Sequence, residues 1–154
     1  MILLDTNLLG RVTDSADPQC TAARRAIHTL LTKREKLVIV PQNLYEFWTV
    51  ATRKQGAPPV GQNGLGMKPV QAGQWLRFFQ RRFVLLPDRE DLLGYWQTLV
   101  TTLGIKGARS HDARLIAAMQ SYGITRLLTF NADFRRPKFD EDLCGQVYTN
   151  SSRW

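Results

Sequence analysis

The sequence predicts an α/β fold in three layers, in which a central, mainly parallel sheet of four to five strands is flanked by helices. Short runs rich in apolar residues alternate along the chain with amphipathic stretches that are long enough to form helices. Prolines and a glycine separate these segments: Pro41 and Pro87 follow apolar runs, and Gly123 follows the last amphipathic stretch. Alternating strands and helices form βαβ units, whose parallel strands are covered by helices on both faces. With 154 residues, we expect residues 1–154 to form a single domain.

The expected strands are short, and the first four are mostly apolar, as buried parallel strands are. In chain order they span Met1–Leu4, Leu37–Val40, Phe83–Leu86, Arg126–Phe130 and Gln146–Tyr148. The polar residue Asp5 ends the first run, and prolines end the second and the third. A proline suits these positions because it cannot donate a hydrogen bond to a neighbouring strand.

The expected helices carry apolar residues at helical spacing. They span Asp17–Glu35, Leu44–Lys54, Val70–Arg82, Asp88–Leu103 and Ser110–Tyr122. Pro18 suits the start of the first helix, and Ser110 is expected to cap the last one. The segment Gln55–Pro69 is rich in glycine and proline. A segment of this length is typical of a functional or mobile loop, and a plain surface excursion between two helices explains it equally well.

The chain is basic, with 21 Lys and Arg against 13 Asp and Glu, which gives a formal net charge of +8. Such a charge attracts phosphate backbones and anionic surfaces over long range, although it does not identify the partner. The basic residues are spread along the chain, so no disordered basic tail is expected. The hydrophobic fraction of 44% is that of an ordinary globular protein.

Cys20 and Cys144 form no C-x-x-C motif and have no histidines at metal-ligand spacing. A disulfide framework and a zinc site are therefore not expected, and a reducing compartment fits. The N-terminal apolar run is too short for a signal peptide, and no stretch reaches the ~20 apolar residues of a membrane span. We expect a cytoplasmic protein with no membrane contact.

Four acidic residues stand where the chain leaves an apolar run or occupies a helix. They are Asp5, Glu46, Asp112 and Asp133. In a parallel sheet the functional site lies beyond the carboxyl ends of the strands, where Asp5 and Asp133 are predicted to lie. Carboxylates about 4 Å apart repel by roughly 4 kcal/mol per pair at an effective dielectric of 20. A divalent cation with oxygen ligands, such as Mg²⁺ or Mn²⁺, relieves that repulsion, so the acids indicate a metal site.

Each of these residues also has an ordinary structural explanation. Asp5 suits an Asx turn or a helix N-cap, Asp112 complements a helix dipole, and Asp133 suits a polar turn. Glu46 falls opposite the apolar stripe of its helix, so periodicity predicts that it faces solvent. His111, beside Asp112, is interpreted as a capping or exposed residue, because no second histidine stands at metal-ligand spacing.

The ordered set of motifs is more specific than any one of its residues. The chain has L-L-D-T-N at its N-terminus, a mid-chain helix with Glu46, H-D-A-R-L-I-A-A opening a later helix, and L-L-T-F-N-A-D-F after the next strand. In order and spacing, this set resembles the PIN domain and, more narrowly, the toxin component of VapBC-type toxin–antitoxin systems. The N-G-L-G at Asn63–Gly66 is similar to a subset of that family.

The resemblance implies a metal-dependent endoribonuclease that cuts single-stranded or looped RNA and leaves a 5′-phosphate and a 3′-hydroxyl. Asp5, Glu46 and Asp112 match the first three acidic positions of the family. Either Asn131 or Asp133 can take the fourth position; we expect Asp133 to fill it, with Asn131 as a polar helper. The supporting polar residues are Thr6, Asn7 and Asn131, and the expected ligands of Mg²⁺ or Mn²⁺ are Asp5 and Asp112. The family also implies a small antitoxin partner and a homodimer.

Two other functions remain open at this point. The chain could be a catalytically inactive PIN-like module that only binds RNA, although all four acids are present. It could also be a haloacid-dehalogenase-like phosphatase, which likewise begins with a strand that ends in Asp. That chemistry needs a second Asp two residues after the first, and Asn7 stands at that position.

Overall fold

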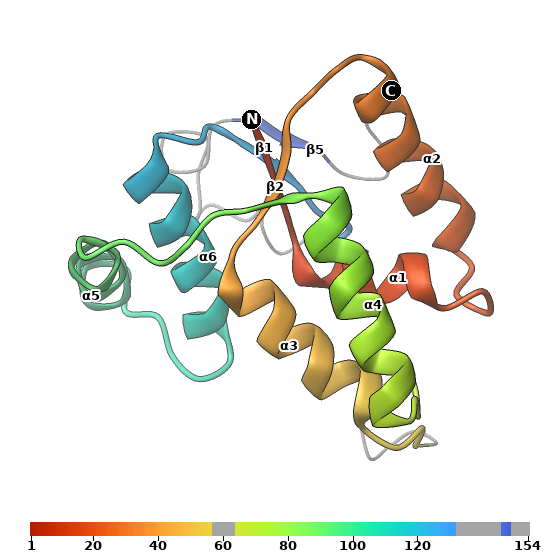
Figure 1. The fold of residues 1–154 in the computed structure, drawn as a ribbon. Coiled ribbons are helices and arrows are strands. Elements are labelled where there is room, and N and C mark those ends of the chain that lie inside the picture. Colours follow the sequence, from red (N-terminus) through yellow and green to blue (C-terminus); the bar gives the residue numbers. More distant parts are fainter. Residues whose placement is uncertain (57–63, 132–145, 149–154) are drawn as a thin grey trace.

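The structure, a computed structural model, describes residues 1–56, 64–131 and 146–148. Its centre is a sheet of five parallel strands in the order β3-β2-β1-β4-β5 (Figure 1). The strands are β1 (Ile2–Leu4), β2 (Leu37–Ile39), β3 (Val84–Leu85), β4 (Arg126–Leu128) and β5 (Gln146–Tyr148). The predicted parallel α/β sheet is therefore confirmed.

Helices connect these strands along the described parts of the chain. They are α1 (Thr6–Thr13), α2 (Cys20–Thr32), α3 (Pro41–Thr52), α4 (Pro69–Arg82), α5 (Leu92–Thr102) and α6 (Arg109–Tyr122). In Figure 1, α1, α2 and α4 lie on one side of the sheet, whereas α5 and α6 lie on the other.

Alternation along the strands creates two apolar cores. Successive side chains of a strand point to opposite faces, so Ile2 and Leu4 pack with α1 to α4, whereas Leu3 packs with α5 and α6. All three side chains are fully buried. The first core is built around Phe79, whose ring contacts that of Phe47 edge to face at 5.0 Å between centroids. The three-layer prediction is confirmed by this division.

Two helix predictions were wrong in ways that matter for the site. The helix α1 was not predicted, because its eight residues begin with polar Thr6 and Asn7. The helix α3 begins at Pro41, three residues before the predicted start at Leu44. Proline suits the first turn of a helix, since its missing N–H has no partner there in any case. Gln42 and Asn43 are therefore helical residues and not part of a loop.

The third strand also differs from its prediction as a buried strand. Val84 and Leu85 of β3 are exposed. The cause is its place at the edge of the sheet, where it pairs only with β2. Edge strands have a free side by necessity, and β3 is very short, which limits unwanted pairing.

Gly123 ends α6, as its position in the sequence predicted. Its φ of 63° is left-handed, a conformation that glycine adopts without strain. Its N–H bonds to the carbonyl of Gln120 and that of Ile124 bonds to the carbonyl of Met119, which together form a Schellman motif. The Schellman motif therefore ends α6 at Gly123 and directs the chain into β4, which in turn sets the position of the residues that follow β4.

Within the described ranges, no helix is both long and apolar enough to cross a membrane. Among the described residues, Cys20 is buried and has a free thiol. Cys144 lies outside the described residues.

Candidate active site

The site begins where two neighbouring parallel strands end. Leu4 of β1 pairs with Leu128 of β4, so the next residues, Asp5 and Thr129, emerge side by side at the carboxyl edge of the sheet. The Thr129 hydroxyl donates a hydrogen bond of 2.5 Å to Asp5 Oδ2, and Asn7 Nδ2 donates one of 2.6 Å to the same oxygen. Asp5 occupies the N-cap position of α1, yet these side-chain bonds turn its carboxylate toward β4.

Thr129 is a site residue that the sequence analysis missed. It is fully buried, and its hydroxyl also accepts hydrogen bonds from Asn7 Nδ2 at 3.2 Å and from the Asn131 backbone N–H at 2.9 Å. Asn7 in turn accepts a bond from the Phe130 N–H through its Oδ1. In the sequence, Thr129 could have been recognised as the first polar residue after β4, a position equivalent to that of Asp5 after β1.

The surroundings raise the pKa of Asp5 from 3.8 to about 6. Burial is the largest cause, because desolvation disfavours the charged form, and the Asp5 residue is only 7% exposed. The negative charges of Asp112 and Glu46 raise the pKa further, whereas the hydrogen bonds from Thr129 and from the Asn7 backbone lower it. Asp5 is therefore a carboxylate that a nearby cation would stabilise strongly.

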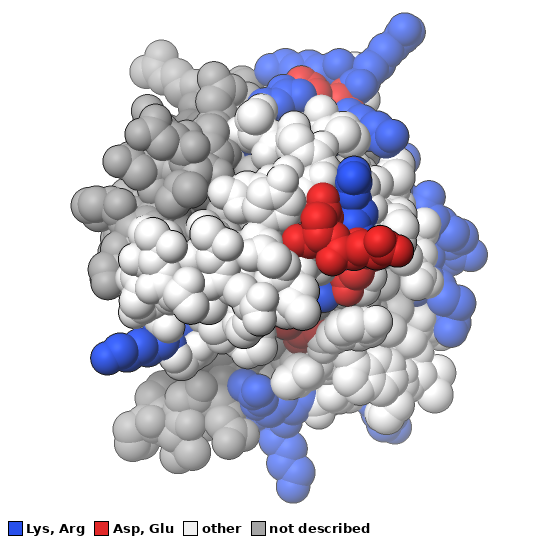
Figure 2. All heavy atoms as spheres, turned by 90° about the vertical axis from the view of Figure 1, so that its left-hand side faces the viewer, with Lys and Arg blue, Asp and Glu red and all other residues white. Residues whose placement is uncertain are grey.

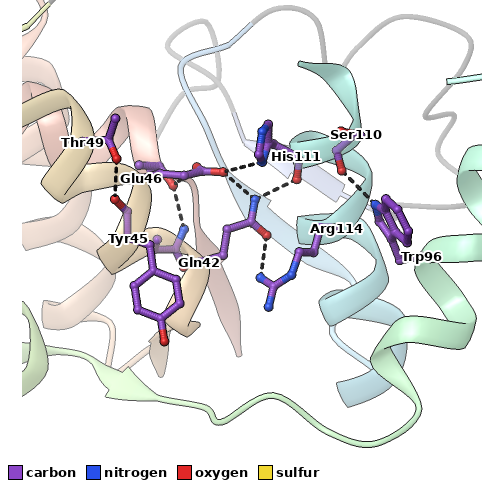
Figure 3. Close-up of polar contacts among 10 residues, drawn as sticks. Gln42, Tyr45, Glu46, Thr49, Trp96, Ser110, His111 and Arg114 are labelled. Carbon is purple, nitrogen blue, oxygen red and sulfur yellow. Dashed lines mark hydrogen bonds and ion pairs between the residues drawn. The ribbon is translucent and has the colours of Figure 1, made fainter. Parts of the chain in front are cut away.

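Glu46 points into the site, so the prediction that it faces solvent was wrong. Thr6 donates a hydrogen bond of 2.7 Å to Glu46 Oε2, and Gln42 Nε2 donates one of 2.7 Å to Glu46 Oε1. The cause is tertiary: α1 packs against α3 and brings Thr6 to the polar side of that helix. In Figure 3 the Glu46 side chain extends from α3 toward α6.

Asn43 locks the start of α3 to the end of β1. Its Oδ1 accepts the backbone N–H of Val40 at 2.8 Å, as a residue in the first turn of a helix can do for the N-cap. Its Nδ2 donates to the carbonyl of Leu4 at 3.0 Å and to the Thr6 hydroxyl at 3.2 Å. The side chain is fully buried and all three contacts are polar, so Asn43 holds the elements that carry Asp5 and Glu46.

Asp112 stands in the first turn of α6, which begins at Arg109 with Ala108 as its N-cap. The prediction that Ser110 caps this helix was therefore wrong, since Ser110 already lies within its first turn. The carboxylate of Asp112 lines the same cleft as Asp5. His111 is exposed, as expected, and its Nδ1 lies 3.7 Å from Glu46 Oε1.

Several of the residues described above line one cleft of about 980 Å³, which we call the acidic cleft. From the predicted set it is lined by Asp5, Thr6, Asn7, Glu46, Asp112 and Asn131. Asp133 lies outside the described residues. Asp14 and Asp17 also line the acidic cleft, together with two arginines, Arg11 and Arg53. Arg11 is paired with Asp17 at 3.0 Å.

Part of the Gln55–Pro69 segment lines the acidic cleft. Gly64 and Leu65 line it, and the Leu65 N–H bonds to the carbonyl of Val50 near the end of α3. A Cβ on Gly64 would lie 2.1 Å from the carbonyl oxygen of Arg53, so only glycine fits at this close approach. Gly64 and Leu65 therefore belong to the lining of the acidic cleft, while residues 57–63 lie outside the described part.

Charge is unevenly distributed over the face of the molecule that carries α5. Figure 2 shows acidic side chains gathered in one patch on the face that carries α5, whereas Lys and Arg lie mostly toward its margins. The helix α5 itself contains no charged residue. Among the described residues on this face, Lys and Arg do not form one continuous basic stripe.

The comparison with protein families decides the relationship. A family model of the PIN domain matches residues 2–140. The chain belongs to the PIN domain family. Among curated protein sequences, none matches it significantly.

Solved structures with the same fold include toxins of bacterial toxin–antitoxin pairs. VapBC2 from Rickettsia felis, bound to a DNA fragment from its promoter, aligns with a TM-score of 0.67 over 97% of this chain and 98% of the other, at 19% identity. A toxin–antitoxin complex from Klebsiella pneumoniae gives 0.63 over 99% and 100%, also at 19% identity. VapC20 from Mycobacterium tuberculosis, a Sarcin-Ricin loop cleaving toxin, gives 0.60 over 88% and 93%, at 19% identity. At this identity, the likeness concerns the fold.

The donor set of this PIN domain suits a hard divalent cation. Within the described ranges, no three His, Cys, Asp or Glu residues are gathered closely enough to hold a metal by themselves. Mg²⁺ does not need such a group, since it keeps several waters and commonly binds through one or two carboxylates. Asp5 and Asp112 line one cleft and repel each other electrostatically, so together they offer the oxygen ligands and the negative charge that such an ion requires.

Proposed function

We propose that this PIN domain is a metal-dependent endoribonuclease, acting as the toxin of a VapBC-type toxin–antitoxin system. The observation that carries the proposal is the convergence of Asp5, Glu46 and Asp112, which are far apart in the sequence, on one cleft at the carboxyl edge of a parallel sheet. That edge is where α/β folds commonly place their functional sites.

The proposed substrate is single-stranded or looped RNA. The net charge of +8 draws a polyanion toward the protein, while the acidic cleft repels phosphate unless a cation is present. Arg53 lines the acidic cleft and is exposed, so it is placed to hold a phosphate beside the scissile bond. Contacts of this kind position the backbone and read little sequence.

The chain's own residues have distinct tasks in the proposed reaction. Asp5 and Asp112 would bind Mg²⁺ or Mn²⁺, and Asn7 and Thr129 keep the Asp5 carboxylate in place. Glu46, held at both oxygens, is oriented to accept a proton from a water within the acidic cleft. When bound, the divalent ion supplies an activated water and stabilises the charge that develops at the phosphodiester.

The proposal predicts that cleavage of single-stranded RNA requires Mg²⁺ or Mn²⁺. Removing the metal with EDTA is expected to stop cleavage, and adding excess Mn²⁺ to restore it, because without a cation the carboxylates of Asp5 and Asp112 repel the phosphate. The measurement is gel analysis of an end-labelled RNA, with mapping of the new ends. Cleavage that continues unchanged in EDTA would contradict the proposal.

The same assay separates the alternatives. An inactive RNA-binding module would retain RNA in a binding assay and never release fragments. A phosphatase would hydrolyse a small phosphomonoester through a phosphorylated Asp5. Asn7 counts against the phosphatase, because that chemistry needs a second Asp at this position to act as a general acid. The amide of Asn7 can donate a hydrogen bond to Asp5 but cannot release a proton as a carboxylic acid does. Occupation of the fourth acidic position by Asp133, with Asn131 as its helper, stays a prediction, as does the homodimer.

The proposed antitoxin partner has a suitable surface away from the acidic cleft. A second hollow of about 240 Å³ lies between α2 and α4, and we call it the α2–α4 groove. Its apolar lining includes Ile27, Trp75 and Phe78, and Phe78 is 45% exposed. Arg24, His28 and Arg82 also line it. An apolar groove with basic residues suits an acidic amphipathic helix, the kind of segment that a small antitoxin would supply.

Substitution in this groove is expected to weaken antitoxin binding without affecting RNA cleavage. Phe78→Glu adds a negative charge that repels an acidic helix, so affinity should fall about tenfold or more, whereas Phe78→Lys should lose less. The partner to test is the product of a short reading frame adjacent to this gene, measured by calorimetry. Leu93→Glu on α5, likewise a change from an exposed apolar residue to an acid but outside the groove, is the control. Equal binding by both Phe78 variants and the wild type would exclude this groove as the docking surface.

A further inference from the structure

Gln42 makes an unusually complete set of hydrogen bonds between the two helices that carry Glu46 and Asp112. Its Nε2 donates to Glu46 Oε1 at 2.7 Å and to the backbone carbonyl of His111 at 2.8 Å. Its Oε1 accepts a bond of 3.0 Å from Arg114 Nη1. The residue is 5% exposed, so these bonds replace water almost entirely. Figure 3 shows the side chain reaching from α3 toward α6.

The chemistry of the three partners leaves only one orientation for the amide and only one suitable residue type. Both groups that face Nε2 are acceptors, a carboxylate and a carbonyl, whereas the guanidinium of Arg114 can only donate. A carboxylate in place of the amide would lose both donors and face Glu46 with a like charge. An apolar side chain of the same length would make none of the bonds.

The network continues outward to the loop before α5. Arg114 Nη2 pairs with Asp88 Oδ2 at 2.5 Å, so the guanidinium is held on its far side. Without Asp88, the Arg114 side chain would be held only by its bond to Gln42, the residue that bonds to Glu46. The Arg114 guanidinium is therefore held between Asp88 and Gln42, and Gln42 in turn bonds to the Glu46 carboxylate.

The inner end of the network fixes the Glu46 carboxylate itself. Each oxygen of Glu46 has its own donor: Gln42, one turn earlier on the same helix α3, donates to Oε1, and Thr6 of α1 donates to Oε2. The bond to the His111 carbonyl also ties α3 to the first turn of α6, immediately before Asp112. Loss of Gln42 would free both the rotamer of Glu46 and the spacing between two acidic side chains of the acidic cleft.

Resting on the proposed nuclease function, we propose that Gln42 is a positioning residue that orients Glu46 and holds the first turn of α6 against α3, with Arg114 as its outer support. It touches neither substrate nor metal. Its role is to present the acids in one arrangement before the substrate and the cation bind. Supporting residues of this kind typically contribute about 10- to 100-fold to activity or metal affinity.

The test compares Gln42→Met with Gln42→Glu and with a matched control, Gln71→Met. Gln71 also stands in the first turn of a helix and makes a backbone hydrogen bond there, to the N–H of Lys68, but it lies in α4 outside the acidic cleft. We expect both Gln42 variants to lose about 10- to 100-fold in kcat with little change in KM for RNA, and Gln71→Met to lose nothing. Titration with Mn²⁺ without RNA, followed by electron paramagnetic resonance, should show weaker binding in the Gln42 variants only.

Arg114→Met extends the test through non-additivity. If Arg114 acts through Gln42, the single variant should lose less than Gln42→Met, and the double variant should be no worse than Gln42→Met alone. Wild-type kcat and Mn²⁺ affinity in Gln42→Glu, with its thermal midpoint unchanged, would overturn the inference while the proposed function survives. If the wild type itself cleaves no RNA with Mn²⁺, the proposed function fails first and this inference fails with it.

Discussion

Asp5→Asn is expected to reduce RNA cleavage by about 1,000-fold or more, the scale of losing a group that stabilises transition-state charge. The Asn side chain keeps the shape and can still accept hydrogen bonds from Asn7 and Thr129, so the fold should be retained. What it loses is the negative charge at the centre of the acidic cleft. Asp112→Asn is expected to behave in the same way. The measurement is kcat at saturating Mn²⁺, with circular dichroism to check folding.

A matched control is available in the acidic cleft. Asp14 lines it and accepts a hydrogen bond from the N–H of Ala16, but it is not one of the acidic residues that raise the pKa of Asp5. Asp14→Asn removes one charge from the same cleft and should leave most activity. Full activity in Asp5→Asn or in Asp112→Asn would rule out the assigned site, whereas an equal loss in Asp14→Asn would indicate a general effect of charge.

The same Asp5→Asn substitution is expected to stabilise the metal-free protein at neutral pH. The pKa of Asp5 is about 6 in the folded state against 3.8 in the ordinary one, mainly because of burial. Above pH 6 the carboxylate is ionised in both states, so folding bears the full cost of burying the charge. A difference of about two pKa units corresponds to something on the order of 3 kcal/mol. Asn carries no charge and escapes this cost.

The sign of the pH dependence follows from the raised pKa. As pH falls from 7 through 6 toward 4, folded Asp5 takes up its proton before the unfolded chain does, so the wild type gains stability relative to Asp5→Asn. Below pH 3.8, the ordinary pKa of the carboxyl in the unfolded chain, stability gains nothing further from this group. The measurement is chemical unfolding of both proteins in EDTA across this range. A constant difference in unfolding free energy between pH 7.5 and 4.5 would contradict the burial of an ionised Asp5.

Glu35 shows why the comparison uses the difference between two variants. The hydrogen bond from Arg126 lowers the pKa of Glu35, so its contribution to stability is present at neutral pH and is lost in acid. This trend opposes that of Asp5 in the total profile. It is common to the wild type and to Asp5→Asn, so subtraction removes it.

Together, these two predictions describe a site that destabilises the folded protein when no cation is bound. The residue expected to be essential for cleavage is also one that destabilises the metal-free protein near neutral pH. Binding of Mg²⁺ or Mn²⁺ at Asp5 is then expected to raise the thermal midpoint, because a ligand that binds only the folded state stabilises it.

The sequence alone determined the architecture and most of the acidic set. Alternation of apolar runs and amphipathic stretches, with breakers between them, was sufficient to predict a parallel sheet with helices on both faces. The place of Asp5 after β1 also put it at the correct edge. These features depend on local patterns, continuous apolar runs for the buried strands and apolar residues at a spacing of 3.6 for the helices, and such patterns can be read from neighbouring residues.

Only the tertiary structure decided which polar side chains meet. Glu46 lies off the apolar stripe of α3, so its own helix predicts solvent. However, α1 packs against α3 and brings Thr6 to one carboxylate oxygen of Glu46, while Gln42, one turn earlier on α3, bonds to the other oxygen and to the His111 carbonyl of α6. Thr129 and Asn43 were missed for the same reason, since each acts through bonds to residues more than 30 positions away. Contacts between polar side chains of distant elements depend on how those elements pack, and no local pattern in the sequence shows which of these side chains meet.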